Sequence, residues 1–184
     1  MAATLTGNTG QTTLPPLDNN NLIHHPDSCL GLSLPLIERI ARILPHNPRT
    51  IVSIGSGTGL FEALLLQYEP ELILYGVEVK SDPPVNKYIP ERYAETVGGT
   101  WDLCSLAENA AAWLFVYPRD PKLVAQYLER YADSRSLEIV IWLGPREDWT
   151  VFEPCFKRTS MRAEMSQDGP LRPYEMMVIY RTKT

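Results

Sequence analysis

The sequence predicts a three-layer α/β sandwich on a mostly parallel sheet that ends in an antiparallel C-terminal hairpin. Apolar, strand-like segments alternate with helical segments from about residue 34 to residue 143. A run of alternating glycines follows the first strand-like segment directly. The last part of the chain changes in kind, because two strand-like segments there are joined through Gly169 and Pro170 with no helix between them.

Each element has a local signal. The first expected helix has Pro35 in its first turn and Pro45 just beyond its end, which are favoured positions for proline. The expected helices are 33–44, 60–68, 85–95 and 121–132. The strand over 137–143 is almost entirely apolar, as in a parallel sheet that helices cover on both faces. The expected strands are 50–54, 72–79, 96–101, 112–117, 137–143, 155–164 and 174–182.

Length and charge limit the organisation and the partners. A chain of 184 residues with 44% hydrophobic residues suits one domain, so we expect a flexible N-terminal arm over 1–30 and one α/β domain over 31–184. The net charge is −5, and no window gathers the lysine and arginine that nucleic-acid binding needs. A small molecule, uncharged or cationic, or a protein fits this balance better.

Cysteine usage and the N-terminal residues indicate the compartment. The three cysteines, Cys29, Cys104 and Cys155, are scattered and lack C-x-x-C spacing, which favours a reduced intracellular environment. Residues 1–21 are polar and contain neither the apolar core of a signal peptide nor a membrane span. We therefore expect a cytoplasmic protein without a membrane partner. The sequence does not indicate its oligomeric state.

Three alternating glycines form the main motif. Gly55, Gly57 and Gly59 lie between an expected strand and an expected helix. Glycine adopts positive φ and lets a ligand approach the backbone, and the N-terminus of the helix presents free N–H groups. Glu78, at the end of the next strand, lies nineteen residues beyond Gly59, close to the spacing at which an acid binds ribose hydroxyls in dinucleotide-binding units. A tight turn and a solvated strand end are the simpler alternative.

These residues resemble the first motif of the class I S-adenosylmethionine-dependent methyltransferases, which have a Rossmann-like fold. The resemblance covers residues 51–79 by motif and residue 34 to the C-terminus by pattern. It implies S-adenosylmethionine as cofactor and the function of a methyltransferase, a transferase enzyme. The resemblance also implies which residues bind the cofactor: its methionine part at Gly55, Ser56, Gly57, Thr58 and Gly59, its ribose at Glu78, and its adenine at Asp102.

Two positions depart from that family. The acidic residue that is common in the first motif is Ser53 here, so a charged partner for the loop or the cofactor's amino group is missing. After the fourth strand, the Asn- or Asp-Pro-Pro-aromatic motif of many amino-methylating enzymes is replaced by Tyr117-Pro118-Arg119. Methylation of an exocyclic amine by that route is therefore not expected.

No catalytic residue stands out. Tyr117, Arg119, Trp142 and Arg146 fall near the carboxyl ends of strands, where ligands bind in open α/β sheets. Tyr117 is a candidate for orienting an acceptor or for proton transfer, although a packed tyrosine that closes a strand is the simpler interpretation. The two arginines are candidates for an anionic substrate or are solvated. We expect no metal site, because the histidines, His24, His25 and His46, share no metal-ligand spacing with carboxylates. His24 or His25 can also act as a base if the arm folds back.

Three functions remain open. The leading hypothesis is a methyltransferase that acts on a small molecule. The second is a methyltransferase-like protein that does not methylate, and instead binds a partner or carries out a cyclisation or isomerisation in the same pocket; Ser53 and Tyr117-Pro118-Arg119 favour it. The third is a nicotinamide-dependent reductase. It is disfavoured by the G-x-G-x-G spacing, by the C-terminal hairpin and by the lack of a Tyr-x-x-x-Lys pair.

Overall fold

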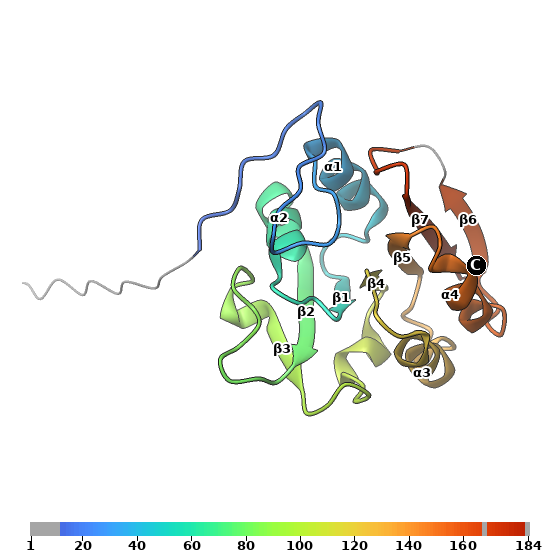
Figure 1. Ribbon diagram of the computed structural model, residues 1–184. Helices are drawn as coiled ribbons and strands as arrows, with labels where there is room; N and C mark the ends of the chain where they lie inside the picture. Colours follow the sequence, from blue (N-terminus) through green and yellow to red (C-terminus); the bar gives the residue numbers. More distant parts are fainter. Residues whose placement is uncertain (1–11, 167–168, 183–184) are drawn as a thin grey trace, which may run out of the picture.

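A single seven-stranded sheet organises the molecule (Figure 1). The computed structural model describes residues 12–166 and 169–182, so the beginning of the arm that was expected to be flexible lies outside the described residues. The strands are β1 Thr50–Ile54, β2 Ile73–Val79, β3 Ala94–Val97, β4 Ala112–Val116, β5 Ile139–Pro145, β6 Arg162–Ser166 and β7 Glu175–Arg181. Their order in the sheet is β3-β2-β1-β4-β5-β7-β6.

The direction of the strands confirms the predicted architecture. The pairs among β1 to β5 are parallel, whereas β7 is antiparallel to β5 and β6 is antiparallel to β7. The α-helices are α1 Leu34–Ile43, α2 Leu60–Tyr68, α3 Pro121–Tyr131 and α4 Trp149–Phe156, and the short 3₁₀ helices are η1 Glu91–Tyr93 and η2 Ser105–Asn109. None of the helices in the described residues is long and apolar enough to cross a membrane.

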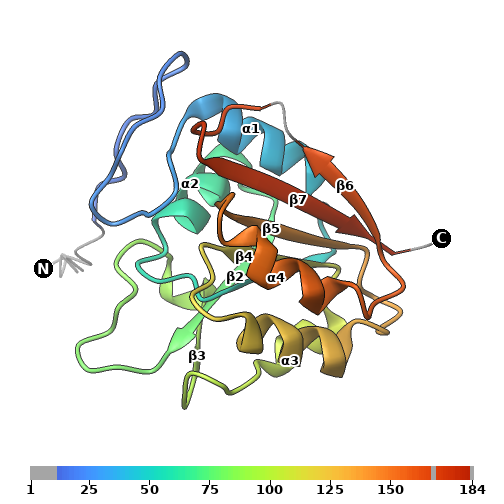
Figure 2. The ribbon, with the colours of Figure 1, turned by 45° about the vertical axis from the view of Figure 1, so that its right-hand side comes forward.

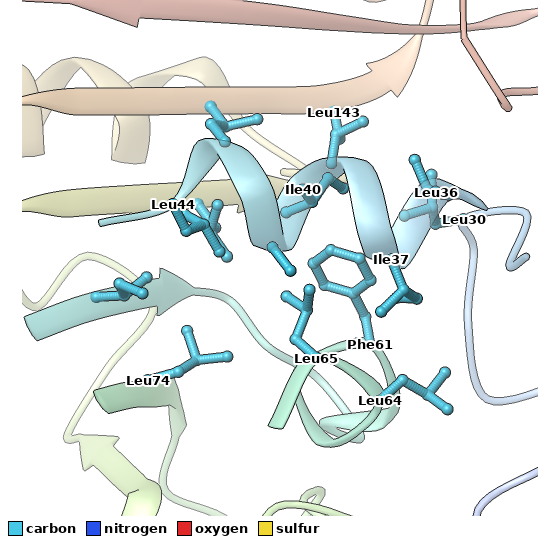
Figure 3. Close-up of a cluster of buried hydrophobic side chains, with 14 of the residues drawn as sticks. Leu30, Leu36, Ile37, Ile40, Leu44, Phe61, Leu64, Leu65, Leu74 and Leu143 are labelled. Carbon is cyan, nitrogen blue, oxygen red and sulfur yellow. The ribbon is translucent and has the colours of Figure 1, made fainter. Parts of the chain in front are cut away.

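The alternation of side chains along the strands divides the core into two layers. On one face, α1 and α2 pack against inward residues such as Ile51, Leu74 and Leu114. On the other face, α3, α4 and η2 cover neighbours such as Val52 and Trp113 (Figure 2). Figure 3 shows the first layer, in which Leu and Ile side chains of α1 meet Phe61, Leu64 and Leu65 of α2. The sandwich therefore has three layers, as predicted.

The prediction of a helix over 85–95 is wrong, except that Glu91–Tyr93 form the short η1. Its backbone donors are used elsewhere: the N–H groups of Lys87 and Tyr88 donate to the carbonyl of Thr58, at 2.9 and 3.2 Å. The side chain of Asn86 accepts from the N–H of Ile89 at 3.0 Å, and Pro90 follows, which has no N–H to give. The segment packs against the glycine loop instead of forming a helix.

The strand predicted over 155–164 is also wrong in its first half. Residues 149–156 form α4, and the strand begins only at Arg162. The aromatic residues Trp149, Phe152 and Phe156 have helical spacing and pack against Trp142 and Tyr180. Burial of that aromatic face outweighs the strand preference of the residues and the cost of Pro154 inside the helix.

Candidate functional site

The glycine loop connects β1 to α2 at the carboxyl edge of the sheet. All three glycines have positive φ, 75° at Gly55, 56° at Gly57 and 78° at Gly59, which residues with a side chain rarely adopt. The N–H groups of Gly55 and Ser56 donate to the carbonyl of Val77, at 2.9 and 3.0 Å. These bonds fix the loop beside the end of β2, and the turn then leads directly into the N-terminus of α2.

The surroundings of the glycines differ along the loop. A Cβ added at Gly55 or Gly57 would meet no atom within 4 Å. A Cβ at Gly59 would clash with the Ile89 side chain and lie 2.7 Å from Asn86 Oδ1. The first two glycines therefore face open space that a ligand can occupy, whereas Gly59 is needed for packing against the segment that follows β2.

Glu78 lies at the C-terminal part of β2 beside this open space. Its Oε2 accepts from the N–H of Gly57 at 2.7 Å, and its Oε1 accepts from the N–H of Val79 at 2.8 Å. The side chain is half-buried. Each carboxylate oxygen carries a second lone pair, so Glu78 can still accept hydrogen bonds from ligand hydroxyls. The structure thus brings together the loop and the acid that the sequence paired.

A second carboxyl group lies beneath the loop. Glu62, in the first turn of α2, is 2% exposed, and its Oε1 accepts from the Ser53 hydroxyl at 2.6 Å. Its Oε2 is buried and has no hydrogen-bond partner among the described residues. Burial raises the pKa of Glu62 to about 7, the Ser53 hydrogen bond opposes this rise, and the negative charge of Glu78 adds to it.

Asp102 lies in the segment after β3, away from β1 in the order of the strands. It is exposed, and its N–H donates to the carbonyl of Gly99 at 3.0 Å. An open cavity of about 660 Å³ adjoins it, lined by residues 95–98 and 101–106. Neither the glycine loop nor Glu78 lines this cavity. A shared pocket of Asp102 with those residues therefore stays a prediction.

Tyr117 follows β4 and is held by a buried carboxylate. It has a positive φ of 50°, which is uncommon for a residue with a side chain. Its hydroxyl donates to Oε1 of Glu175 at 2.7 Å, and Glu175, at the start of β7, is 0% exposed. The same oxygen accepts from the N–H of Gly31 at 3.0 Å, and Oε2 accepts from the N–H of Arg172 at 3.0 Å. Burial and the hydrogen bond to Glu175 raise the pKa of Tyr117 well above its usual value.

The N-terminal segment reaches the glycine loop as well. The Thr58 hydroxyl donates to the carbonyl of Asp27 at 2.8 Å. The carboxylate of Asp27 accepts from Lys87 Nζ at 2.7 Å and from the Tyr88 hydroxyl at 2.8 Å. Together with the bond from Gly31 to Glu175, these contacts hold residues 27–31 between the glycine loop and Tyr117.

Among the other sequence candidates, His25 contacts this arrangement through Asp27. Arg119 is exposed, and Arg146 is exposed with its Nε donating to the Pro173 carbonyl at 2.9 Å. Trp142 is fully buried in the aromatic core with α4. His24 and His46 are exposed, whereas His25 is half-buried and its Nδ1 accepts from the Asp27 N–H at 3.2 Å. Within the described ranges, no group of three His, Cys, Asp or Glu side chains can hold a metal ion.

Three residues of the site were missed by sequence reasoning. Glu62 is the one acid in an otherwise apolar stretch of α2, and Glu175 opens the apolar strand β7, so a lone charge in an apolar segment was the available signal. Asp27 has no such signal, because it lies in an irregular segment and takes its partners from residues about sixty positions away.

The strand order, the antiparallel C-terminal strands and the glycine loop define a Rossmann-like fold of the class I S-adenosylmethionine-dependent methyltransferase type. No family model matches the sequence, and a search of curated proteins finds no relative. The classification therefore comes from structure.

Solved structures of methyltransferases match most of the chain. Precorrin-6y C5,15-methyltransferase from Geobacter metallireducens aligns with a TM-score of 0.61 and 9% identity, over 93% of this chain and 100% of that one. A SAM-dependent methyltransferase from Aquifex aeolicus aligns at 0.56 and 11%, over 80% and 89%. Mitomycin 7-O-methyltransferase MmcR aligns at 0.55 and 18%, over 79% and 53%. At these identities the likeness establishes the fold and leaves the substrate open.

Proposed function

We propose that this protein binds S-adenosylmethionine at the glycine loop and transfers its methyl group to a small molecule. One observation carries the proposal: Gly55 and Gly57 have positive φ and face open space directly beside the half-buried carboxylate of Glu78. A side chain at either glycine would fill the space that a cofactor needs. The residues present therefore fit the group that the fold implies.

Each residue has a role in this proposal. Residues 55–59 hold the methionine part of the cofactor, Glu78 accepts from the ribose hydroxyls, and Asp102 contacts the adenine ring. The bound cofactor supplies a methyl group on a positively charged sulfur. The protein's part is to align an acceptor with that methyl group, because transfer to a good nucleophile depends mainly on proximity and orientation.

Several observations favour a small molecule as the acceptor. The net charge of −5 suits an uncharged or cationic acceptor better than a nucleic acid. Two of the matched structures are named for methyl transfer to small molecules, a precorrin and mitomycin. The acceptor then lies near Tyr117 and residues 27–31. Because the Tyr117 hydroxyl donates to Glu175 and its pKa is raised, we assign Tyr117 a role in shaping the site rather than in removing a proton.

Two features of the site, at Tyr117 and at Ser53, favour a second candidate function. The Tyr117 hydroxyl already donates to Glu175, and the first motif has Ser53 in place of an acid. Both features favour a methyltransferase-like protein that binds a partner or carries out a reaction without methyl transfer. A reaction without methyl transfer would use the same pocket as the first candidate. Partner binding would not require a bound cofactor.

Calorimetric titration tests the proposal. We expect wild type to bind S-adenosylmethionine and S-adenosylhomocysteine at micromolar concentrations, and Glu78→Ala and Gly57→Val to lose this binding while NADH and NADPH do not bind. Methyl-labelled cofactor with a panel of small molecules then separates the two candidates, since labelled product supports the methyltransferase. Cofactor binding without product for any acceptor would favour the second candidate. No binding at all would contradict the methyltransferase and leave the second candidate, as a partner-binding protein, in first place.

A further inference from the structure

Glu62 is a buried acid whose hydrogen bonding is incomplete. Its Oε1 is held by Ser53, and its Oε2 is shielded from water without a partner in the described part of the chain. A buried carboxylate that lacks partners costs free energy, and such groups are usually paired. An acid at position 62 therefore costs more free energy than an apolar residue would if its role were only packing. The buried residues around it in α2 are apolar.

The position of Glu62 connects it to the glycine loop. It lies three residues after Gly59, and its partner Ser53 lies two residues before Gly55, so the pair joins the two ends of the loop. Ser53 also stands at the motif position where an acid is common. The hydrogen bond from Ser53 to Glu62 thus places a carboxyl group next to position 53, where this chain has serine instead of the common acid.

The groups around Glu62 are known from each neighbouring element. Ser53 faces it from β1, and the field of Glu78 acts on it from β2. The buried residues that α1 supplies to the packing against α2 are apolar, among them Leu36, Ile37 and Ile40. Burial raises the pKa of Glu62 to about 7, so near neutral pH the group exchanges a proton when the local charge changes.

We propose that Glu62 is a positioning residue that gives the glycine loop its preference for a cationic cofactor over a neutral one. The inference rests on the proposed function, because S-adenosylmethionine carries a positive sulfonium whereas S-adenosylhomocysteine is a neutral thioether at that atom. A cation at the loop favours the ionised form of Glu62, which then attracts the cation through a low-dielectric region. Binding therefore releases a proton from Glu62 near pH 7.

The test compares both ligands in wild type and in Glu62→Gln. We expect Glu62→Gln to weaken binding of S-adenosylmethionine about tenfold and binding of S-adenosylhomocysteine less than about threefold. Titrations at pH 7 in buffers of different ionisation enthalpy should show proton release when wild type binds S-adenosylmethionine, and none in Glu62→Gln. Glu71→Gln, an exposed change of the same charge just after α2, should alter neither quantity.

Further outcomes keep the inference separate from the proposed function. Ser53→Asp combined with Glu62→Gln returns an acid to the loop from the other member of the pair, and it should restore the preference for the cation. Equal weakening of both ligands, or wild-type binding without proton release, would overturn the role of Glu62 and leave cofactor binding intact. Absence of binding by wild type would overturn the proposed function, and the role of Glu62 with it.

Discussion

Two halves of the site are built in different ways. One half, called the cofactor side after the proposed ligand, consists of residues 53–62 and Glu78, which come from one strand–loop–helix–strand unit. The arm side consists of residues 27–31, Tyr117 and Glu175, and its central bonds join residues 144 and 58 positions apart. On the cofactor side, local chain geometry leaves space for a ligand. On the arm side, a buried carboxylate collects two donors from distant segments, Gly31 and Tyr117, and a third from Arg172, three residues before it.

The contrast indicates where binding and stability reside. Open space at Gly55 and Gly57 contributes nothing to the stability of the free protein, so substitutions there should affect ligands first. Glu175 is fully buried and accepts hydrogen bonds from Gly31, Tyr117 and Arg172, so substitutions there should affect the stability of the fold first. Substitutions on each side can therefore show whether ligand affinity and stability are separate in this way.

The largest effect should come from Gly57→Val. The new side chain enters the open space, and the positive φ of 56° disfavours a β-branched residue. We expect the affinity for S-adenosylmethionine to fall by at least about a thousandfold, with a loss of about 1–2 kcal/mol in the free energy of unfolding. Calorimetry and denaturant titration measure the two quantities. Retained binding would show that the ligand does not use this space.

The next effect is a pH dependence of stability from Glu62. Its pKa is raised on folding, so the folded protein holds the proton more tightly than the unfolded chain. The stability of wild type is then greatest below about pH 4.5 and falls as the pH rises through 7, relative to Glu62→Gln. The difference should reach about 3 kcal/mol above pH 8. Denaturant titrations of both proteins from pH 4.5 to 8.5 measure it, and parallel curves would show that Glu62 is not the group responsible.

Glu175→Gln should separate the two sides. The amide keeps the size of the side chain but places an NH₂ group against the donors that Glu175 now accepts. We expect the free energy of unfolding to fall by about 2 kcal/mol while the affinity for S-adenosylmethionine changes less than about threefold. Glu164→Gln, on the exposed part of β6, is the matched control and should change stability little. Loss of cofactor affinity in Glu175→Gln alone would mean that the two sides act as one unit.

The smallest effect should come from Thr58→Val, which removes the hydrogen bond between the two sides. The hydroxyl of Thr58 donates to the carbonyl of Asp27, so its loss should lower stability by at most about 1 kcal/mol. Amide exchange at residues 27–31 should become several-fold faster. Thr100→Val, at an exposed position, should leave this exchange unchanged. Unchanged exchange in Thr58→Val would show that Glu175 and the bonds of Asp27 to Lys87 and Tyr88 hold residues 27–31 without the Thr58 hydroxyl.

Sequence reasoning could predict the cofactor side because its signals are contiguous. The strand, the glycines, the helix and Glu78 lie within thirty residues, and each glycine has the positive φ that favours this residue type. The sheet was predictable for the same reason, since an almost entirely apolar run such as 137–143 indicates a strand that is covered on both faces. The predictions failed where tertiary contacts decide the structure. In 85–95, for example, the N–H groups of Lys87 and Tyr88 donate to the carbonyl of Thr58 in the glycine loop.

The arm side could not be predicted, because nothing local marks its partners. Gly31 looks like an ordinary loop glycine, and Tyr117 looks like a residue that closes a strand. Their common partner, Glu175, becomes recognisable only after β7 pairs with β5 and brings its first residue opposite Pro145. Glu62 is an intermediate case, since a lone acid in an apolar helix signals burial but does not reveal Ser53 as its partner.

The hydrogen bonds of Glu175 also impose an order on events during synthesis. Gly31 is made early, but its partner oxygen exists only after residue 175 has been made and β7 has entered the sheet between β5 and β6. Loop closure over so long a separation is slow compared with local helix and hairpin formation. The arm side is therefore assembled last, after the cofactor side has already been translated as one continuous piece.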